Sequence, residues 1–258
     1  MMPITVAVIQ CPTLPADDPD ARLTALVAPA AVRGARLVAL PGRHGLNVAG
    51  YLDACRHVAG KFSIALITGS YLSENYLEAA AIGPDGAVIG RQRQTHLGSW
   101  ERERGLFAGD SLDVFPTSIG RVGLLLGEDI RYPEVARILA LQGAEVLVHL
   151  AATPAPFLEE AWLAQLWREV QANQTFGLQS CLVGDGHIGR SAVLAPVEMT
   201  PGDTGVLERA AMTKGVELLV ASLDFDARAA IIAAYPILSY LNTDLYLREL
   251  LPAYEGGA

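Results

Sequence analysis

The sequence predicts an α/β protein in which helices cover a mixed β-sheet. Apolar runs of strand length, bounded by Gly or Pro, recur along the chain, as is typical of strands buried on both faces. Helical patterns lie between these runs in the first and middle thirds. A hairpin and consecutive strands interrupt the alternation, so a simple doubly wound sheet is not expected. Because no linker, low-complexity tract or internal repeat is visible, residues 1–258 are predicted to form one domain.

The predicted strands are the apolar runs. The sequence GPDG at 83–86 is a turn signal, so the run that contains it is expected to form a hairpin. In chain order the runs are 4–10, 36–41, 64–71, 79–90, 122–127, 145–152, 179–186, 191–196 and 216–226.

Five segments have helical character. In the first, acidic residues precede apolar side chains spaced three or four apart, such as Leu23 and Val27. In the third, Pro133 lies near the first turn and Gly143 follows the end. The segments are 18–33, 48–59, 132–142, 157–174 and 227–250, the last broken by Pro236.

Composition and charge exclude several classes of protein. A chain of 258 residues buries roughly 75% of its unfolded surface, so its core needs no disulfide or metal. The 28 acidic against 19 basic residues disfavour nucleic acid or an anionic membrane surface as a partner. The cysteines, at positions 11, 55 and 181, are odd in number and show no CxxC spacing. Both facts argue against a disulfide framework or a zinc cluster. The 51% of hydrophobic residues indicate buried sheets, a subunit interface or both.

The expected compartment follows from two features that the sequence lacks. The opening MMPITVAVIQ carries neither the basic region nor the cleavage site of a secretory signal. No apolar stretch reaches the ~18 to 20 residues of a membrane span. A cytoplasmic protein without a membrane partner is therefore expected.

Ordered landmarks run from residue 4 to residue 246. Together, in this order and at these separations, they resemble the nitrilase superfamily, the carbon–nitrogen hydrolases. The landmarks are Gln10, LVALPGRHGLNVAGY (37–51), ITGSY (67–71), GPDGAVIGRQRQTHL (83–97), RVGLLLGEDIRYPEVARILALQGAEVLV (121–148), GRSAVLAP (189–196), Asp224 and DLY (244–246).

The resemblance implies a fold and an assembly. The expected fold is a four-layer α-β-β-α sandwich, with two mixed sheets face to face and helices outside each. Members of the family commonly pair through outer helices, so a homodimer or higher oligomer is expected. The C-terminal segment, about 227–258, is a candidate for that interface.

The resemblance also implies a catalytic glutamate, lysine and cysteine. In the family the thiol attacks an amide or nitrile carbon, the glutamate is the general base and the lysine stabilises the tetrahedral intermediate. The matching positions here are Gly42 in LPG, Gln94 in RQTHL and Gly127 in LLLGEDIRYPE. None of the three side chains can perform the family's role.

These replacements predict a catalytically inactive member of the family. Removing a catalytic triad costs on the order of a million-fold in rate. We therefore expect a pseudoenzyme that binds a small carbonyl or amide-like ligand or has a role in assembly. Whether the chain is an enzyme stays open at this point, and the three positions favour that it is not.

Polar residues nevertheless remain around these positions. A carboxylate beside a histidine can perform acid–base chemistry, so the alternative is a hydrolase of an amide-like substrate that uses Glu128, Glu103 or His44 without a cysteine. A plainer interpretation is that Glu128 and Arg131 are solvated or paired within their loop and that His96 is structural. Glu101 is the alternative to Glu103 as the match to the family's second glutamate. The candidate pocket residues are Arg43, His44, His96, Glu103, Glu128, Arg131 and His149.

Neither a metal nor a substitute thiol is expected in the pocket. No ligand spacing supports a metal site among His44, His96, Glu103 and Glu128, and no cofactor is predicted. Cys181 lies in a run that reads as a buried strand, where an inert thiol is the expected state.

Overall fold

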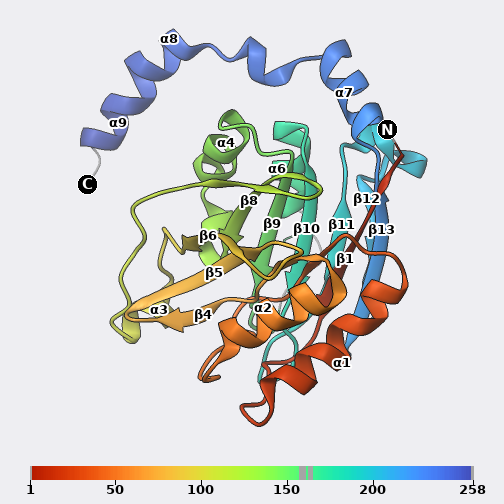
Figure 1. The fold of residues 1–258 in the computed structure, drawn as a ribbon. Helices are drawn as coiled ribbons and strands as arrows, with labels where there is room; N and C mark the ends of the chain where they lie inside the picture. Colours follow the sequence, from red (N-terminus) through yellow and green to blue (C-terminus); the bar gives the residue numbers. More distant parts are fainter. Residues whose placement is uncertain (1, 157–160, 162–164, 257–258) are drawn as a thin grey trace.

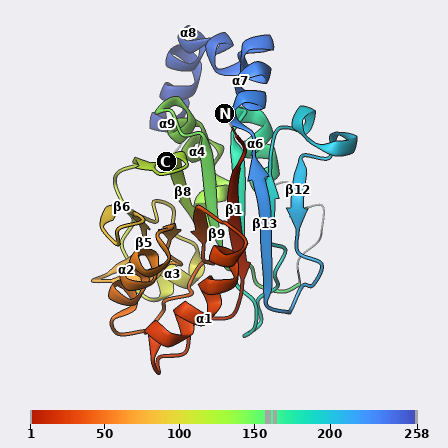
Figure 2. The same cartoon turned by 45° about the vertical axis from the view of Figure 1, so that its right-hand side comes forward.

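The computed structural model describes residues 2–156, 161 and 165–256, which form two mixed sheets packed face to face (Figures 1 and 2). In the first sheet the order is β13-β1-β2-β3-β5-β4, with β6 paired to β5. Its strands are β1 (Ile4–Gln10), β2 (Leu37–Ala39), β3 (Ala65–Ile67), β4 (Tyr71–Ser73), β5 (Tyr76–Ile82), β6 (Val88–Arg93) and β13 (Glu217–Leu223).

The second sheet has the order β12-β11-β10-β9-β8-β7. In each sheet the inner strands are parallel: β1, β2 and β3 in the first, and β8, β9 and β10 in the second. The strands of the second sheet are β7 (Val114–Thr117), β8 (Gly120–Leu126), β9 (Val146–Ala151), β10 (Phe176–Cys181), β11 (Ala192–Leu194) and β12 (Val206–Arg209).

Helices cover the outer face of each sheet. Helices α1 (Pro19–Val32) and α2 (Tyr51–Phe62) share an apolar cluster with the first sheet. Helices α4 (Pro133–Leu141) and α6 (Leu166–Asn173) share another with the second sheet. A third cluster, drawn from both sheets, fills the space between them. The predicted four-layer α-β-β-α sandwich is confirmed.

The landmark glutamine closes one end of this core. Gln10 is buried, and its Nε2 donates to the carbonyl oxygens of Met212 and Gly215 at 2.8 and 3.0 Å. Its Oε1 accepts from the backbone N–H of Ser191 at 3.0 Å. Both ends of the side chain are thus used to join β1 to the loops beside β11 and β13.

The C-terminal part of the chain leaves the sandwich. As predicted, the helical segment breaks at Pro236, because α7 ends two residues earlier. The short helices that follow arch over one end of the molecule (Figure 1). Within the described residues, no helix has the length and apolar character needed to cross a membrane. The segment comprises α7 (Phe225–Ala234), η4 (Ile237–Tyr240), α8 (Thr243–Leu245), η5 (Tyr246–Leu250) and α9 (Leu251–Gly256).

Several predicted bounds need correction. The run 64–71 divides between β3 and β4, and β10 starts three residues before the predicted run 179–186. The predicted helix 157–174 is seen as α6 from Leu166 onward, while 157–160 and 162–164 lie outside the described residues. Elements that the sequence did not predict are β7, β12, the five-residue helix α3 (Ser99–Glu103) and the 3-10 turns η1 (Gly127–Arg131), η2 (Val197–Met199) and η3 (Pro201–Asp203).

Candidate functional site

A pocket opens where the parallel strands of both sheets end. The loops after β2 and β3 face those after β8 and β9, and together they supply most of its lining. Its empty volume is ≈ 500 Å³ including the open mouth, of which ≈ 40 Å³ admits the centre of a water molecule. Of the residues expected at the site, those that line the pocket are Gly42, Arg43, Gly127, Glu128, Arg131 and His149.

One side of the pocket carries a buried ion pair. The guanidinium Nη2 of Arg43 lies 3.0 Å from Oε1 of Glu101, and Oε2 of Glu101 accepts from the N–H of Gly98 at 3.0 Å. The same guanidinium lies 3.8 Å above the centre of the Trp100 ring. On the backbone side, Ser70 Oγ accepts from the N–H of Arg43 at 2.6 Å. Both partners of the pair are therefore held in place before any ligand binds.

The placement of Glu101 corrects the prediction for Glu103. Both belong to α3, but Glu101 is buried at the pocket whereas Glu103 is exposed and does not line it. Two residues correspond to about 200° of rotation around a helix, so the two side chains leave α3 on opposite faces. The alternative match, Glu101, is the one that the structure places at the site.

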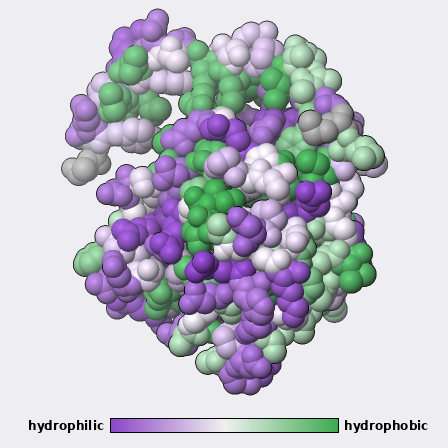
Figure 3. Space-filling model, viewed as in Figure 1, coloured by the Kyte–Doolittle hydropathy of each residue, from purple (hydrophilic) through white to green (hydrophobic). Residues whose placement is uncertain are grey.

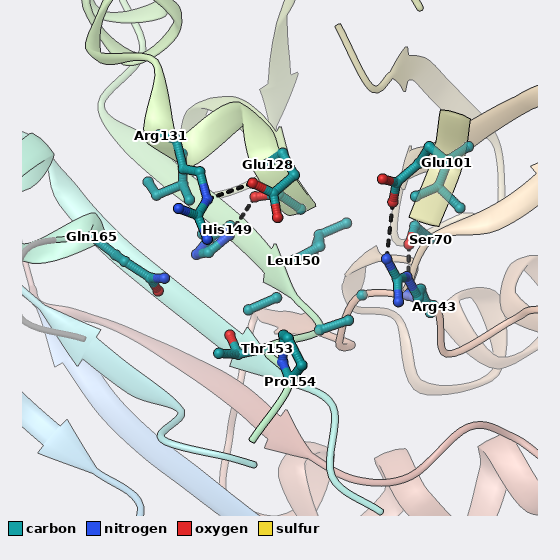
Figure 4. A pocket seen from close by; sticks show the side chains of 16 residues that line it. Arg43, Ser70, Glu101, Glu128, Arg131, His149, Leu150, Thr153, Pro154 and Gln165 are labelled. Carbon is teal, nitrogen blue, oxygen red and sulfur yellow. Dashed lines mark hydrogen bonds and ion pairs between the residues drawn. The ribbon is translucent and has the colours of Figure 1, made fainter. Parts of the chain in front are cut away.

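The other side of the pocket carries a second ion pair. Glu128 and Arg131 come from η1, the turn that follows β8, and Glu128 Oε2 contacts Arg131 Nε (Figure 4). The pairing inside the loop is the plainer interpretation drawn from the sequence. It does not remove Glu128 from the pocket, because its side chain is 37% exposed and lines the cavity.

The two carboxyl groups lie close to one another. A Cβ atom built on Gly98 would be 3.1 Å from Glu101 Oε2 and 3.3 Å from the carboxyl carbon of Glu128. Two carboxyl groups that each have an arginine partner, in a pocket of this size, are suited to move a proton to or from a bound molecule.

His149 lies beneath the turn that carries Glu128. Its Nε2 is 3.2 Å from the carbonyl oxygen of Gly127, and its Nδ1 is 3.4 Å from Oε1 of Gln179. Burial lowers the pKa of His149, and the hydrogen bonds to Gln179 and to Gly127 oppose that shift. The imidazole therefore supports the turn that carries Glu128.

The three positions matched to the family triad differ in the room they offer. A Cβ on Gly42 would lie 2.6 Å from the carbonyl oxygen of Leu150, so the backbone of β9 fills the space where a side chain would begin. Gly127 has φ +51°, a left-handed conformation that glycine adopts without strain. Gln94 is buried beside Gly127, and its Nε2 donates to the carbonyl oxygen of His96 at 2.7 Å.

Asp129 holds this region together. Its Oδ1 accepts from the N–H groups of Thr95 and His96 at 3.0 and 2.8 Å, and its Oδ2 accepts from the N–H of Leu126 at 3.2 Å. The carboxylate thus fixes the 94–96 loop against the turn after β8. The aspartate belongs to the DIRYPE landmark, whereas its role as a clamp could not be read from the sequence.

Two predicted pocket histidines lie elsewhere. His44 is buried with its Nδ1 2.8 Å from the hydroxyl of Tyr51, and burial lowers its pKa to about 3. His96 stacks on Tyr132 with ring centres 3.8 Å apart, and it lines a different hollow. Both are therefore corrected to packing residues outside the pocket.

In the described part of the chain, the pocket has neither a metal-binding arrangement of side chains nor a thiol. Over residues 2–156, 161 and 165–256, no group of three or more His, Cys, Asp or Glu side chains is arranged to hold a metal ion. All three cysteines are free and buried, and none lines the pocket. Burial raises the pKa of the Cys181 thiol, which keeps it protonated and unreactive.

Comparisons with known proteins agree with the fold. The carbon-nitrogen hydrolase family model matches residues 5–224, so the chain belongs to the carbon–nitrogen hydrolases of the nitrilase superfamily. It is 27% identical to human omega-amidase NIT2 over 260 residues, which cover 89% of this chain and 91% of NIT2. It is 31% identical to N-carbamoylputrescine amidase of Solanum tuberosum over 167 residues, covering 59% and 56% of the two chains. A carbon-nitrogen hydrolase structure from Helicobacter pylori G27 superposes with a TM-score of 0.80 at 22% identity, covering 96% and 98%.

These relatives contradict the prediction of a catalytically inactive protein. That prediction inferred loss of activity from three positions, whereas proteins similar to this chain over much of its length are named amidases. The prediction gave more weight to the three replaced positions than to the alternative chemistry that the remaining polar residues offer. The pocket retains two carboxyl groups and two arginines that the triad comparison did not weigh.

Proposed function

We propose that the protein hydrolyses the carbon–nitrogen bond of a small amide in this pocket. The observation that carries the proposal is the pair of carboxyl groups, Glu101 and Glu128, each with its own arginine at one cavity. The amidase names of the relatives support the same class of reaction.

In the proposed reaction, water is the nucleophile. Gly127 has no side chain to attack with, and the cysteines are buried away from the cavity. The Glu128 carboxylate removes a proton from the water, whose oxygen forms a bond to the amide carbon while the carbonyl electrons move onto oxygen. The carbon–nitrogen bond then breaks, and the nitrogen leaves with the proton that Glu128 had taken. A carboxylic acid and ammonia or an amine are formed.

The arginine partner of Glu128 gives the step its electrostatic support. In the resting site the charge of Arg131 is balanced by Glu128. Once Glu128 is protonated, that balance is lost at the moment when negative charge develops on the substrate oxygen. The guanidinium then stabilises the oxyanion. Glu101 is less suited to be the base, since its two oxygens already accept from Arg43 and Gly98.

The first test of this proposal compares two glutamate variants. Positioned general bases contribute about 10²- to 10⁴-fold, so Glu128→Gln is expected to reduce amide turnover by about 100-fold or more. Glu103→Gln is the matched control, because Glu103 is exposed on α3 and does not line the pocket. Ammonia release from small primary amides is the measurement. Equal activity of the two variants would remove Glu128 from the mechanism.

We further propose that the protein forms a homodimer or higher oligomer through its C-terminal segment and acts in the cytoplasm. Exposed Leu and Tyr side chains occur along this segment, and green residues alternate with purple ones at the top of Figure 3. Patches of this kind on a soluble protein mark interaction sites. The three free cysteines are consistent with a reducing compartment. The exposed residues include Tyr235, Tyr240, Tyr246, Leu247, Leu251 and Tyr254.

A further inference from the structure

Gln94 carries a buried acceptor that no described residue satisfies. The side chain is 1% exposed, and its Oε1 has no hydrogen-bond partner in the described part of the chain. Its Nε2 donates to the carbonyl oxygen of His96 at 2.7 Å. Because that bond requires an N–H donor, the oxygen is fixed on the other branch of the amide. Buried polar groups without a partner are rare, so this one calls for an explanation.

Gln94 does not itself line the pocket, but its unsatisfied oxygen lies next to Gly127, which does. A Cβ atom on Gly127 would be 3.4 Å from Nε2 and 3.6 Å from Oε1 of Gln94. Gly127 itself lines the pocket and has no side chain to separate the two. A ligand group that rests over Gly127 therefore becomes a neighbour of the Gln94 amide.

The backbone keeps Gln94 in this position. Its N–H donates to the carbonyl oxygen of Leu77 at 2.9 Å, and its own carbonyl oxygen accepts from Gly109 at 2.8 Å. The two residues that follow are held by Asp129. The acceptor is thus part of a rigid frame, as a group that orients a substrate must be.

A second unsatisfied acceptor belongs to the same pocket. Gln165 lines the cavity, and its Oε1 is also buried without a partner among the described residues (Figure 4). Two such oxygens favour a ligand that brings N–H donors. The NH₂ group of a primary amide carries two, whereas an ester presents only acceptors at that end.

We propose that Gln94 is a specificity-determining residue whose Oε1 accepts a hydrogen bond from the amide nitrogen of the substrate. The site thereby selects primary amides and related carbamoyl compounds over esters of the same acid. This inference rests on the proposed amide hydrolysis and deepens it. Groups built to hydrogen-bond a substrate discriminate strongly against analogues that lack the partner, because the buried group is then left unpaired.

The test compares a primary amide and the methyl ester of the same acid. For Gln94→Met, kcat/KM for the amide is expected to fall by about 10- to 100-fold, while kcat/KM for the ester stays within about twofold of wild type. A purely structural role would lower both values alike. An equal fall for both substrates, or no change for the amide, overturns the inference.

Gln92 provides the matched control two residues away. It is equally buried, but its Nε2 donates to the carbonyl oxygens of Arg93 and Ser111, both at 2.8 Å, and its Oε1 accepts from the N–H of Asp113 at 3.2 Å. Gln92→Met is therefore expected to lower the Tm more than Gln94→Met does. It should leave the ratio of amide to ester activity unchanged. A shift of that ratio as large as the one in Gln94→Met contradicts the specific role of Gln94.

A binding measurement on the wild-type protein needs neither turnover nor a folded variant. A primary amide is expected to raise the Tm, whereas the matching methyl ketone, which replaces NH₂ by CH₃, is expected to raise it less. If turnover is absent but this difference is seen, the proposed hydrolysis fails and the selection of an NH₂ group stands. Loss of the difference in Gln94→Met then assigns the selection to Gln94 rather than to Gln165. If turnover is present and the two compounds shift the Tm equally, only the role of Gln94 fails.

Discussion

At the scale of single residues, Gly42 shows how closely the backbone surrounds the site. A Cβ at this position would lie 2.6 Å from one backbone oxygen and 3.0 Å from the carbonyl carbon of Ala151. Neither neighbour is a flexible side chain. An ordinary side chain at 42 therefore requires movement of β9, so replacing Gly42 by glutamate does not by itself recreate the family's base.

This crowding predicts opposite effects for two glycine-to-alanine changes. Gly42→Ala is expected to lower the free energy of unfolding by about 1–3 kcal/mol, as overpacking does. Gly60→Ala, inside α2, is expected to raise it by about 0.5–1 kcal/mol, because its Cβ would meet nothing closer than 3.6 Å. Denaturant unfolding measures both. An unchanged free energy of unfolding for Gly42→Ala would show that the loop after β2 can accommodate a methyl group.

His44 predicts a dependence of stability on pH. Burial lowers its pKa from 6.5 to about 3. Between these two pH values, the unfolded chain therefore binds a proton at His44 that the folded chain does not bind. The stability that neutral His44 contributes is complete above pH 6.5 and is lost as pH falls towards about 3. The destabilisation caused by His44→Gln, measured by denaturant unfolding, should therefore be smaller at pH 5 than at pH 7. The same destabilisation at both values would contradict this assignment.

The sequence located several site residues but not their interactions. Arg43, Glu128 and Arg131 were expected at the pocket because they flank the landmark positions, and they are there. The sequence could not decide between Glu101 and Glu103. Both lie in α3, which has only five residues and therefore gives no periodic signal to show which side chain faces the pocket. The unsatisfied Oε1 of Gln94 could not be predicted either, because its surroundings come from residues distant in the chain and no local sequence pattern indicates them.

At the scale of secondary-structure elements, burial explains which predictions succeeded. The inner strands β1, β8 and β9 are largely buried, so they read as continuous apolar runs. The edge strand β12 is half exposed, and its sequence VLER carries no such run. The hairpin of β5 and β6 was found because its turn residues are themselves a signal.

At the scale of the whole molecule, the apolar excess in the composition divides between the sandwich and the C-terminal segment. Three apolar clusters lie within the sandwich layers. The C-terminal segment buries little of its apolar surface against them, and no residue of η4, α8 or η5 is buried. A second copy of the chain would cover this surface.

The oligomer proposal predicts a change of mass in solution. The wild-type protein is expected to be a dimer or larger in size-exclusion chromatography with light scattering, and Leu247→Glu is expected to shift it towards the monomer. Val32→Glu is the control, because Val32 is an even more exposed apolar residue on α1, far along the chain from the C-terminal segment. A monomeric wild-type protein at micromolar concentration would contradict the proposal.

We propose above all that the pocket with Glu128 hydrolyses amides. The most direct test of this claim is ammonia release by the purified wild-type protein from small primary amides and N-carbamoyl amines, with Glu128→Gln measured in parallel. We expect release that is proportional to protein concentration for at least one compound and that is lost in Glu128→Gln. Release no faster than in buffer for every compound would contradict the claim.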